Sequence, residues 1–205
     1  MATEIETPYG PARVHQHAAD EPRAALVLGH GAGGGVTAAD LTVATEVALK
    51  EDISVALVEQ PYRVAGRRSP APANQLDVAW RAVLERLRAD ELVGLPLIVG
   101  GRSLGARVAC RTAEETGAVA VLCLAFPVHP PGRPERSRLA ELDAVEVPVL
   151  VVQGESDPFG MPPDAPNRTV ARVKGDHGLK ADRAAVADAI GSWLRDGPAL
   201  RTRGR

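Results

Sequence analysis

Short, uninterrupted apolar runs recur along this chain, and each is followed by a longer segment with a different periodicity. The first clear run, Ala24–Gly29, follows a charged residue and leads into a glycine-rich stretch. Apolar runs of this kind are typical of strands buried on both faces of a parallel sheet. Similar runs occupy residues 53–58, 96–100, 118–125 and 148–153, with a shorter one at 169–173. Weaker strand signals at residues 4–7 and 13–18 precede them.

Amphipathic helical patterns lie between these runs. Thr37–Asp40 has the form of a capping box and predicts the start of a helix. The apolar positions of two later helices are Leu76, Trp80, Val83, Leu84 and Leu87, then Val186, Ala189, Ile190, Trp193 and Leu194. Alternating strands and helices indicate an α/β fold with a mostly parallel central sheet and helices on both faces. We predict one such domain over residues 1–195 and a flexible basic tail over residues 196–205.

The composition of the chain argues against several classes of binding partner. A formal net charge of −2 provides no electrostatic footprint for nucleic acid or an anionic membrane. No apolar run approaches the ~20 residues of a membrane helix, and the acidic first residues do not resemble a signal peptide. We therefore expect a cytoplasmic protein with neither a nucleic-acid nor a membrane partner. Cys110 and Cys123 lie in apolar segments, which predicts two core thiols rather than a disulfide framework.

A Gly-x-Ser-x-Gly motif, Gly101–Gly105, directly follows one of the predicted strands and precedes a small-residue helix. In that context the motif is a nucleophile elbow, a sharp strand-to-helix turn that presents a serine hydroxyl at the sheet edge. Ser103 is therefore our candidate nucleophile, and the N–H of Leu104 is a candidate oxyanion donor. The alternative interpretation is a tight turn with only a structural role.

A serine needs a base to accept its proton and an acid to orient that base. Asp157 follows the run at 148–153 and a glycine turn, so we predict it as the acid, with Glu155 as the local competitor. His177 lies in a glycine-flanked loop between the last predicted strand and the last helix, and we predict it as the base. Its neighbour Asp176 is expected to face solvent or cap a turn. The order serine, acid, histidine is that of nucleophile-elbow enzymes.

The glycine-rich stretch after the first strand predicts the remaining oxyanion donor. Glycines there let backbone N–H groups converge where side chains would interfere. We assign the donor to the N–H of Ala32 or Gly33. His30 is expected to support this loop by hydrogen bonds, the alternatives being a base or a substrate contact. A phosphate-binding loop is a weak rival, because the stretch lacks the P-loop lysine and a Gly-x-Gly-x-x-Gly continuation.

Further residues are candidates for contact with a substrate. His129 lies in a proline-rich loop near the predicted mouth of the site. Arg63, Arg67, Arg68 and Arg102 lie in or beside loops at the carboxyl ends of strands, where they could select an acidic substrate. The alternative for these arginines is that they are solvated loop residues.

Together, these motifs resemble those of the α/β-hydrolase superfamily across nearly the whole chain. More narrowly, the chain resembles the cap-less branch that contains the testis-expressed hydrolase-like proteins and a subunit of the non-specific-lethal chromatin complex. Two segments that point to this branch are Phe126–Gly132 and Asp157–Gly160. Dienelactone hydrolases are similar at a greater distance, but they carry cysteine in place of Ser103.

The resemblance implies an α/β-hydrolase fold without a cap domain and a serine hydrolase without cofactor or metal. Its partner would be a small-molecule acyl substrate, an ester or related acyl compound, cleaved through an acyl-enzyme. Residues 126–143 are too few for a helical lid, which predicts a shallow, open cleft suited to small acyl groups. Some relatives are better regarded as scaffolds, so the alternative is a catalytically silent binding module.

Overall fold

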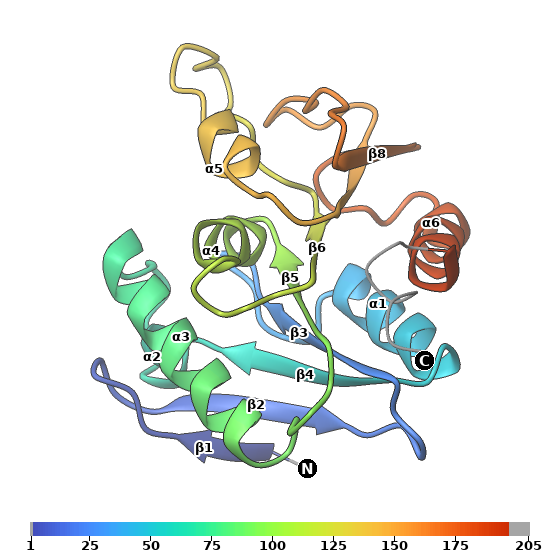
Figure 1. Ribbon diagram of the computed structural model, residues 1–205. Helices are drawn as coiled ribbons and strands as arrows, with labels where there is room; N and C mark the ends of the chain where they lie inside the picture. The colour runs from blue at the N-terminus through green and yellow to red at the C-terminus, as the bar shows by residue number, and fades with distance from the viewer. Residues whose placement is uncertain (1, 197–205) are drawn as a thin grey trace.

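The computed structural model describes residues 2–196, which form an eight-stranded sheet in the order β1-β2-β4-β3-β5-β6-β7-β8 (Figure 1). Strands β1 and β2 pair antiparallel with their neighbours, and every pairing from β4 to β8 is parallel. The strands are β1 (Ala2–Ile5), β2 (Ala12–His17), β3 (Ala24–Gly29), β4 (Ile53–Glu59), β5 (Leu97–Arg102), β6 (Ala120–Leu124), β7 (Val149–Gly154) and β8 (Arg168–Val173). Each predicted strand is present. Of the predicted tail over residues 196–205, Asp196 ends the last helix and the rest lies outside the described residues.

Helices cover both faces of the sheet, as predicted (Figure 1). They are α1 (Ala39–Lys50), α2 (Pro61–Val64), α3 (Ala73–Ala89), α4 (Leu104–Thr112), α5 (Leu139–Asp143) and α6 (Arg183–Asp196). Side chains alternate along β3, where Ala25 and Val27 belong to one core while Leu26 and Leu28 belong to the other. The first core includes α3, α4 and α5, and the second includes α1 and α6. Burial on both faces explains why inner strands such as β3 and β6 are continuously apolar.

The predicted capping box at the start of α1 is wrong. The helix begins at Ala39, and its N-cap residue Ala38 makes no side-chain cap. Asp40, which the capping box would use, is buried, and its carboxylate lies 2.9 Å from the Nε of Arg102. The Asp40 side chain therefore forms an ion pair with a distant segment instead of capping the helix as the local pattern had predicted.

No cap covers the sheet within the described residues. The connection between β6 and β7, where a lid would lie, contains only the short helix α5. The cysteines are buried free thiols in one core, as predicted, with their sulfur atoms 3.5 Å apart. The hydrogen bond to Cys123, and then burial, raise the pKa of Cys110 well above its ordinary value. Both thiols therefore lie in the core, away from solvent.

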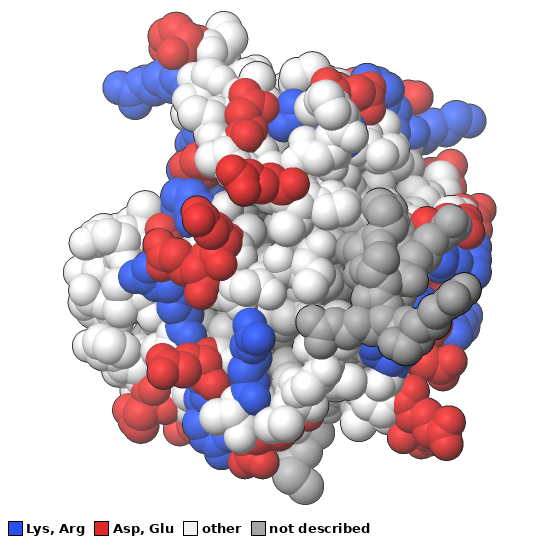
Figure 2. Space-filling model, viewed as in Figure 1, with Lys and Arg blue, Asp and Glu red and all other residues white. Residues whose placement is uncertain are grey.

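Acidic and basic side chains are interspersed on the face shown in Figure 2. No helix among residues 2–196 is both long enough and apolar enough to cross a membrane. Within the same range, no group of three or more His, Cys, Asp or Glu residues is placed to hold a metal ion.

Candidate active site

The turn between β5 and α4 holds Ser103 in a backbone conformation that is rare for a residue with a side chain. Its φ is 50° and its ψ is −103°, outside the regions that L-residues ordinarily occupy. The flanking glycines make this turn sterically accessible. A Cβ on Gly105 would lie 2.5 Å from the carbonyl carbon of Gly29, and one on Gly101 would lie 2.9 Å from the Gly29 nitrogen. The elbow thus packs directly on the end of β3, and only glycine permits this approach.

Ser103, His177 and Asp157 form a continuous hydrogen-bonded chain. His177 Nε2 lies 2.9 Å from Ser103 Oγ, and His177 Nδ1 lies 2.8 Å from Asp157 Oδ2. The Asp157 side chain is 1% exposed and that of His177 is 17% exposed, so the acid is shielded while the base remains accessible. The ring of Phe159 packs on the imidazole with centroids 4.2 Å apart. This geometry lets the imidazole exchange a proton with the serine while the carboxylate fixes its orientation.

The other nearby acids are not placed to orient His177. Asp176 accepts the N–H of Gly178 at 2.8 Å and so caps a turn, as its sequence position suggested. Glu155 is exposed at the end of β7. Asp157 is therefore the carboxylate that the fold brings to the histidine.

Gln153 supports the acid in a way that the sequence analysis missed. It is fully buried near the end of β7, and its Nε2 donates to Asp157 Oδ2 at 2.9 Å. The same nitrogen reaches the carbonyls of Phe126 at 3.1 Å and Gly160 at 2.8 Å. The N–H of Phe159 donates to the other carboxylate oxygen at 2.8 Å. The sequence did contain a signal for this role, a single amide side chain in an otherwise apolar strand. A buried polar side chain requires hydrogen-bond partners, so this glutamine had to contact polar groups nearby.

The loop after β3 lies beside the nucleophile. A Cβ on Gly31 would be 3.7 Å from the Cβ of Ser103. His30 Nδ1–H donates to the carbonyl of Gly31 at 2.8 Å, and its Nε2 accepts the N–H of Gln60 at 3.1 Å. Burial lowers the pKa of the His30 imidazole, which favours the neutral ring that these two bonds require. His30 therefore supports the loop, as expected.

Tyr62 provides a second support for the loop that the sequence analysis did not anticipate. Its hydroxyl donates to the carbonyl of Ala32 at 3.0 Å, and burial raises the pKa of Tyr62 to about 12. The hydroxyl therefore keeps its proton and remains a donor. Ala32 and Gly33 lie in the turn held by these contacts, and Leu104 begins α4, where the first N–H groups have no acceptor within the helix.

A family model described as an alpha/beta hydrolase domain matches residues 22–189. The chain belongs to the α/β-hydrolase family. The matched segment includes the elbow, the loop after β3, Asp157 and His177. This hydrolase domain therefore carries all of the candidate catalytic residues.

Solved structures of hydrolases share the fold over almost the whole chain. The lidless α/β serine hydrolase XC6422 from Xanthomonas campestris has 21% sequence identity and a TM-score of 0.76, covering 96% of this chain and 94% of that one. Est1E from Butyrivibrio proteoclasticus has 14% identity and a TM-score of 0.75, covering 95% and 98%. A dienelactone hydrolase from Anabaena variabilis has 14% identity and a TM-score of 0.75, covering 96% of each chain. At these identities the likeness establishes the fold.

Three further candidates for substrate contact each donate a side-chain hydrogen bond to a backbone carbonyl. His129 Nδ1–H donates to the carbonyl of Pro130 at 2.9 Å, and its backbone N–H donates to Phe159. Arg63 donates to the carbonyl of Arg67 in its own loop at 3.4 Å. Arg102, directly before the nucleophile, donates to the backbone carbonyl of His177 at 3.1 Å and pairs with Asp40.

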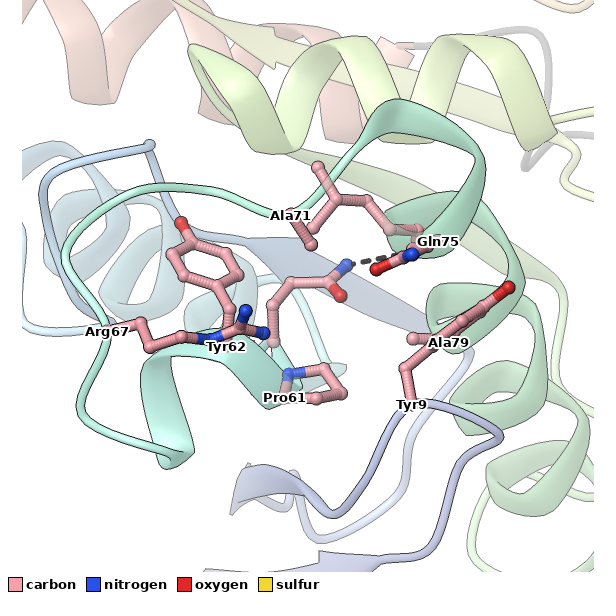
Figure 3. Close-up of a pocket in the computed structure, with 9 residues that line it drawn as sticks. Tyr9, Pro61, Tyr62, Arg67, Ala71, Gln75 and Ala79 are labelled. Atoms are coloured by element: carbon pink, nitrogen blue, oxygen red, sulfur yellow. Dashed lines mark hydrogen bonds between the residues drawn. The ribbon is translucent and has the colours of Figure 1, made fainter.

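A pocket of about 120 Å³ opens beside the segment that follows β4 (Figure 3). Tyr62 and Arg67 line it from that segment, and Tyr9 lines it from the connection between β1 and β2. The pocket is therefore bounded by the tyrosine that holds the carbonyl of Ala32.

Proposed function

We propose that this protein is a serine hydrolase that cleaves a small carboxylic ester or related acyl bond through an acyl-enzyme. The observation that carries the proposal is the chain Ser103–His177–Asp157, with contacts of 2.9 and 2.8 Å at the carboxyl edge of the sheet. Within the family, the motifs at Phe126–Gly132 and Asp157–Gly160 favour the cap-less branch with the testis-expressed hydrolase-like proteins. The proposed compartment is the cytoplasm.

The reaction begins when Ser103 Oγ attacks the acyl carbon and His177 Nε2 takes the hydroxyl proton. The backbone N–H of Leu104 and that of Ala32 or Gly33 stabilise the resulting oxyanion. The tetrahedral intermediate collapses, the C–O bond to the leaving group breaks, and His177 returns its proton to the departing oxygen. Water then attacks the acyl-enzyme while His177 takes a proton from it, and the second collapse releases the carboxylic acid and restores the serine hydroxyl. Asp157 accepts the Nδ1–H bond throughout and stabilises the imidazolium.

The open architecture favours small or exposed acyl groups. Only the five-residue helix α5 interrupts the connection that follows β6, so no helical lid in the described residues encloses a long acyl chain. Est1E, which shares the fold, has been solved with ferulic acid bound, which is a small aromatic acid. We therefore propose a small acyl compound as the substrate.

A catalytically silent binding module is the competing function. Such a module has no need for a serine held at a positive φ in hydrogen-bond contact with a histidine that a buried carboxylate orients. A fluorophosphonate probe distinguishes the two, since it phosphonylates only an activated serine. We expect one adduct, located on the peptide containing Ser103 by mass spectrometry, and its absence from heat-denatured protein. Failure of the folded protein to react at Ser103 would favour the binding module.

The pH dependence of hydrolysis should report the base. Because His177 must be neutral to accept the serine proton, kcat/KM should rise from acidic to neutral pH. The measurement is the initial rate on a short p-nitrophenyl ester across this range. His177→Gln should abolish both the activity and this limb. A rate that stays flat from acidic to neutral pH would contradict the histidine base.

A further inference from the structure

Arg102 is the last residue of β5 and directly precedes the candidate nucleophile. Its guanidinium faces three segments that are distant in sequence. Nε lies 2.9 Å from Asp40 Oδ2 on α1. Nη2 donates to the backbone carbonyl of His177 at 3.1 Å. Nη1 lies against the loop after β3, so close that a Cβ on Gly31 would be 2.9 Å from it. One side chain of the elbow thus touches α1, the histidine loop and the oxyanion loop.

Asp40 is an unusual partner because its side chain is fully buried. Oδ1 accepts the N–H of Leu41 at 3.0 Å, whereas Oδ2 has the ion pair with Arg102 but no aligned hydrogen bond. Burial raises the pKa of the Asp40 carboxyl, and the charges of Arg102 and His177 oppose that increase. A carboxylate in this environment is stabilised mainly by its cation, so the two side chains form one electrostatic unit.

We propose that Arg102 is a positioning residue of the hydrolase, which holds the backbone of His177 from behind the elbow while Asp40 neutralises its charge. This inference rests on the proposed function. A guanidinium is suited to the task because its planar, rigid donors can engage several acceptors at once. It must also be neutralised, because an uncompensated cation beside the base would oppose formation of the imidazolium during proton transfer.

Charged groups face His177 from several sides. Asp157 binds Nδ1 from the loop after β7, Arg102 lies behind the backbone from β5, and Asp40 lies behind Arg102 on α1. Asp176, on the same loop as His177, has its carboxylate on the N–H of Gly178. Phe159, which packs on the imidazole from the loop that carries Asp157, is uncharged. Removing Asp40 or Arg102 therefore changes the charge balance without touching the contacts of the imidazole.

Two variants should move the ionisation of His177 in opposite directions. Asp40→Asn leaves the Arg102 cation uncompensated, which should lower the midpoint of the His177 titration by about 0.5 to 1 pH unit. Arg102→Gln removes the cation that contacts the backbone of His177 and should raise the midpoint. Arg102→Gln should also lower kcat roughly 10- to 100-fold with a much smaller change in KM, because the contact with the histidine loop is lost. Loss of structural integrity alone has no reason to produce opposite shifts.

The experiment is an NMR titration of the histidine Cε1–H signals in the full chain, with His177 assigned by its absence from His177→Gln. The double variant Asp40→Asn/Arg102→Gln removes both charges, so its midpoint should return towards that of the parent while kcat remains low. It also avoids an unpaired buried charge if a single variant fails to fold. Asp77→Asn is the matched control, since Asp77 pairs with Arg111 at 2.6 Å between α3 and α4. It should leave the His177 titration unchanged.

An unchanged or raised midpoint in folded Asp40→Asn would overturn the inference, as would parental kcat in Arg102→Gln. The titration needs no turnover. A parent that neither hydrolyses esters nor reacts with fluorophosphonate would therefore refute the proposed function, while the opposite shifts would still test the arrangement around Arg102. For an active parent, the acid limb of kcat/KM should move with the NMR midpoint in both single variants.

Discussion

Replacing Ser103 with alanine should lower kcat/KM for a short p-nitrophenyl ester by at least ~10³-fold, as losses from catalytic triads usually do. The hydroxyl oxygen is the only atom removed, and it is the atom that His177 Nε2 contacts at 2.9 Å. No acyl-enzyme can then form on this residue. The residual activity can be measured as an initial rate, with the variant at a much higher concentration than is used for the parent and the ester still in excess over the protein.

Ser192→Ala provides the matched control, because Ser192 is an exposed serine on α6. It should hydrolyse the ester at the parental rate and react normally with fluorophosphonate. Circular dichroism and thermal unfolding should show that Ser103→Ala is folded. If the folded Ser103→Ala variant retained most of the parental activity, the nucleophile would have to be another group.

Replacing Gly105 with alanine should destabilise the fold by more than about 3 kcal/mol, although alanine normally favours a helix by about 1 kcal/mol over glycine. The two effects have opposite signs, so the measured sign decides which one dominates. The new Cβ would lie 2.5 Å from the carbonyl carbon and 3.0 Å from the Cα of Gly29. Both are backbone atoms of a central strand, which cannot move aside as a flexible side chain could. Urea unfolding of the parent and the variant measures the difference.

Gly34→Ala is the control for this substitution. A Cβ at Gly34 would meet no atom within 4 Å, and no positive φ excludes alanine there. Its free energy of unfolding should stay within about 1 kcal/mol of the parent. If Gly105→Ala were as stable as Gly34→Ala, the close packing of the elbow on β3 would be wrong.

The fold and the chain positions of the candidate triad were predictable because both depend on local patterns. A strand buried on both faces must be apolar throughout, so runs such as Ala24–Gly29 indicate β3 without knowledge of their neighbours. Ser103 lies between two glycines that its turn requires, and Asp157 and His177 follow strands whose carboxyl ends meet at one edge of the sheet. Parallel pairing then brings these loops together.

The polar contacts around these residues were decided only by the tertiary structure. Asp40 has the spacing of a capping residue, yet its carboxylate pairs with Arg102, which follows it by more than sixty positions. Tyr62 and Gln153 likewise reach acceptors on other segments, the carbonyls of Ala32 and Phe126, although Gln153 also donates to the nearby Asp157. Apolar periodicity specifies which face of an element is buried, but a buried polar group bonds whichever partner the packed chain places within about 3 Å. That choice depends on distances between elements, which no local pattern in the sequence contains.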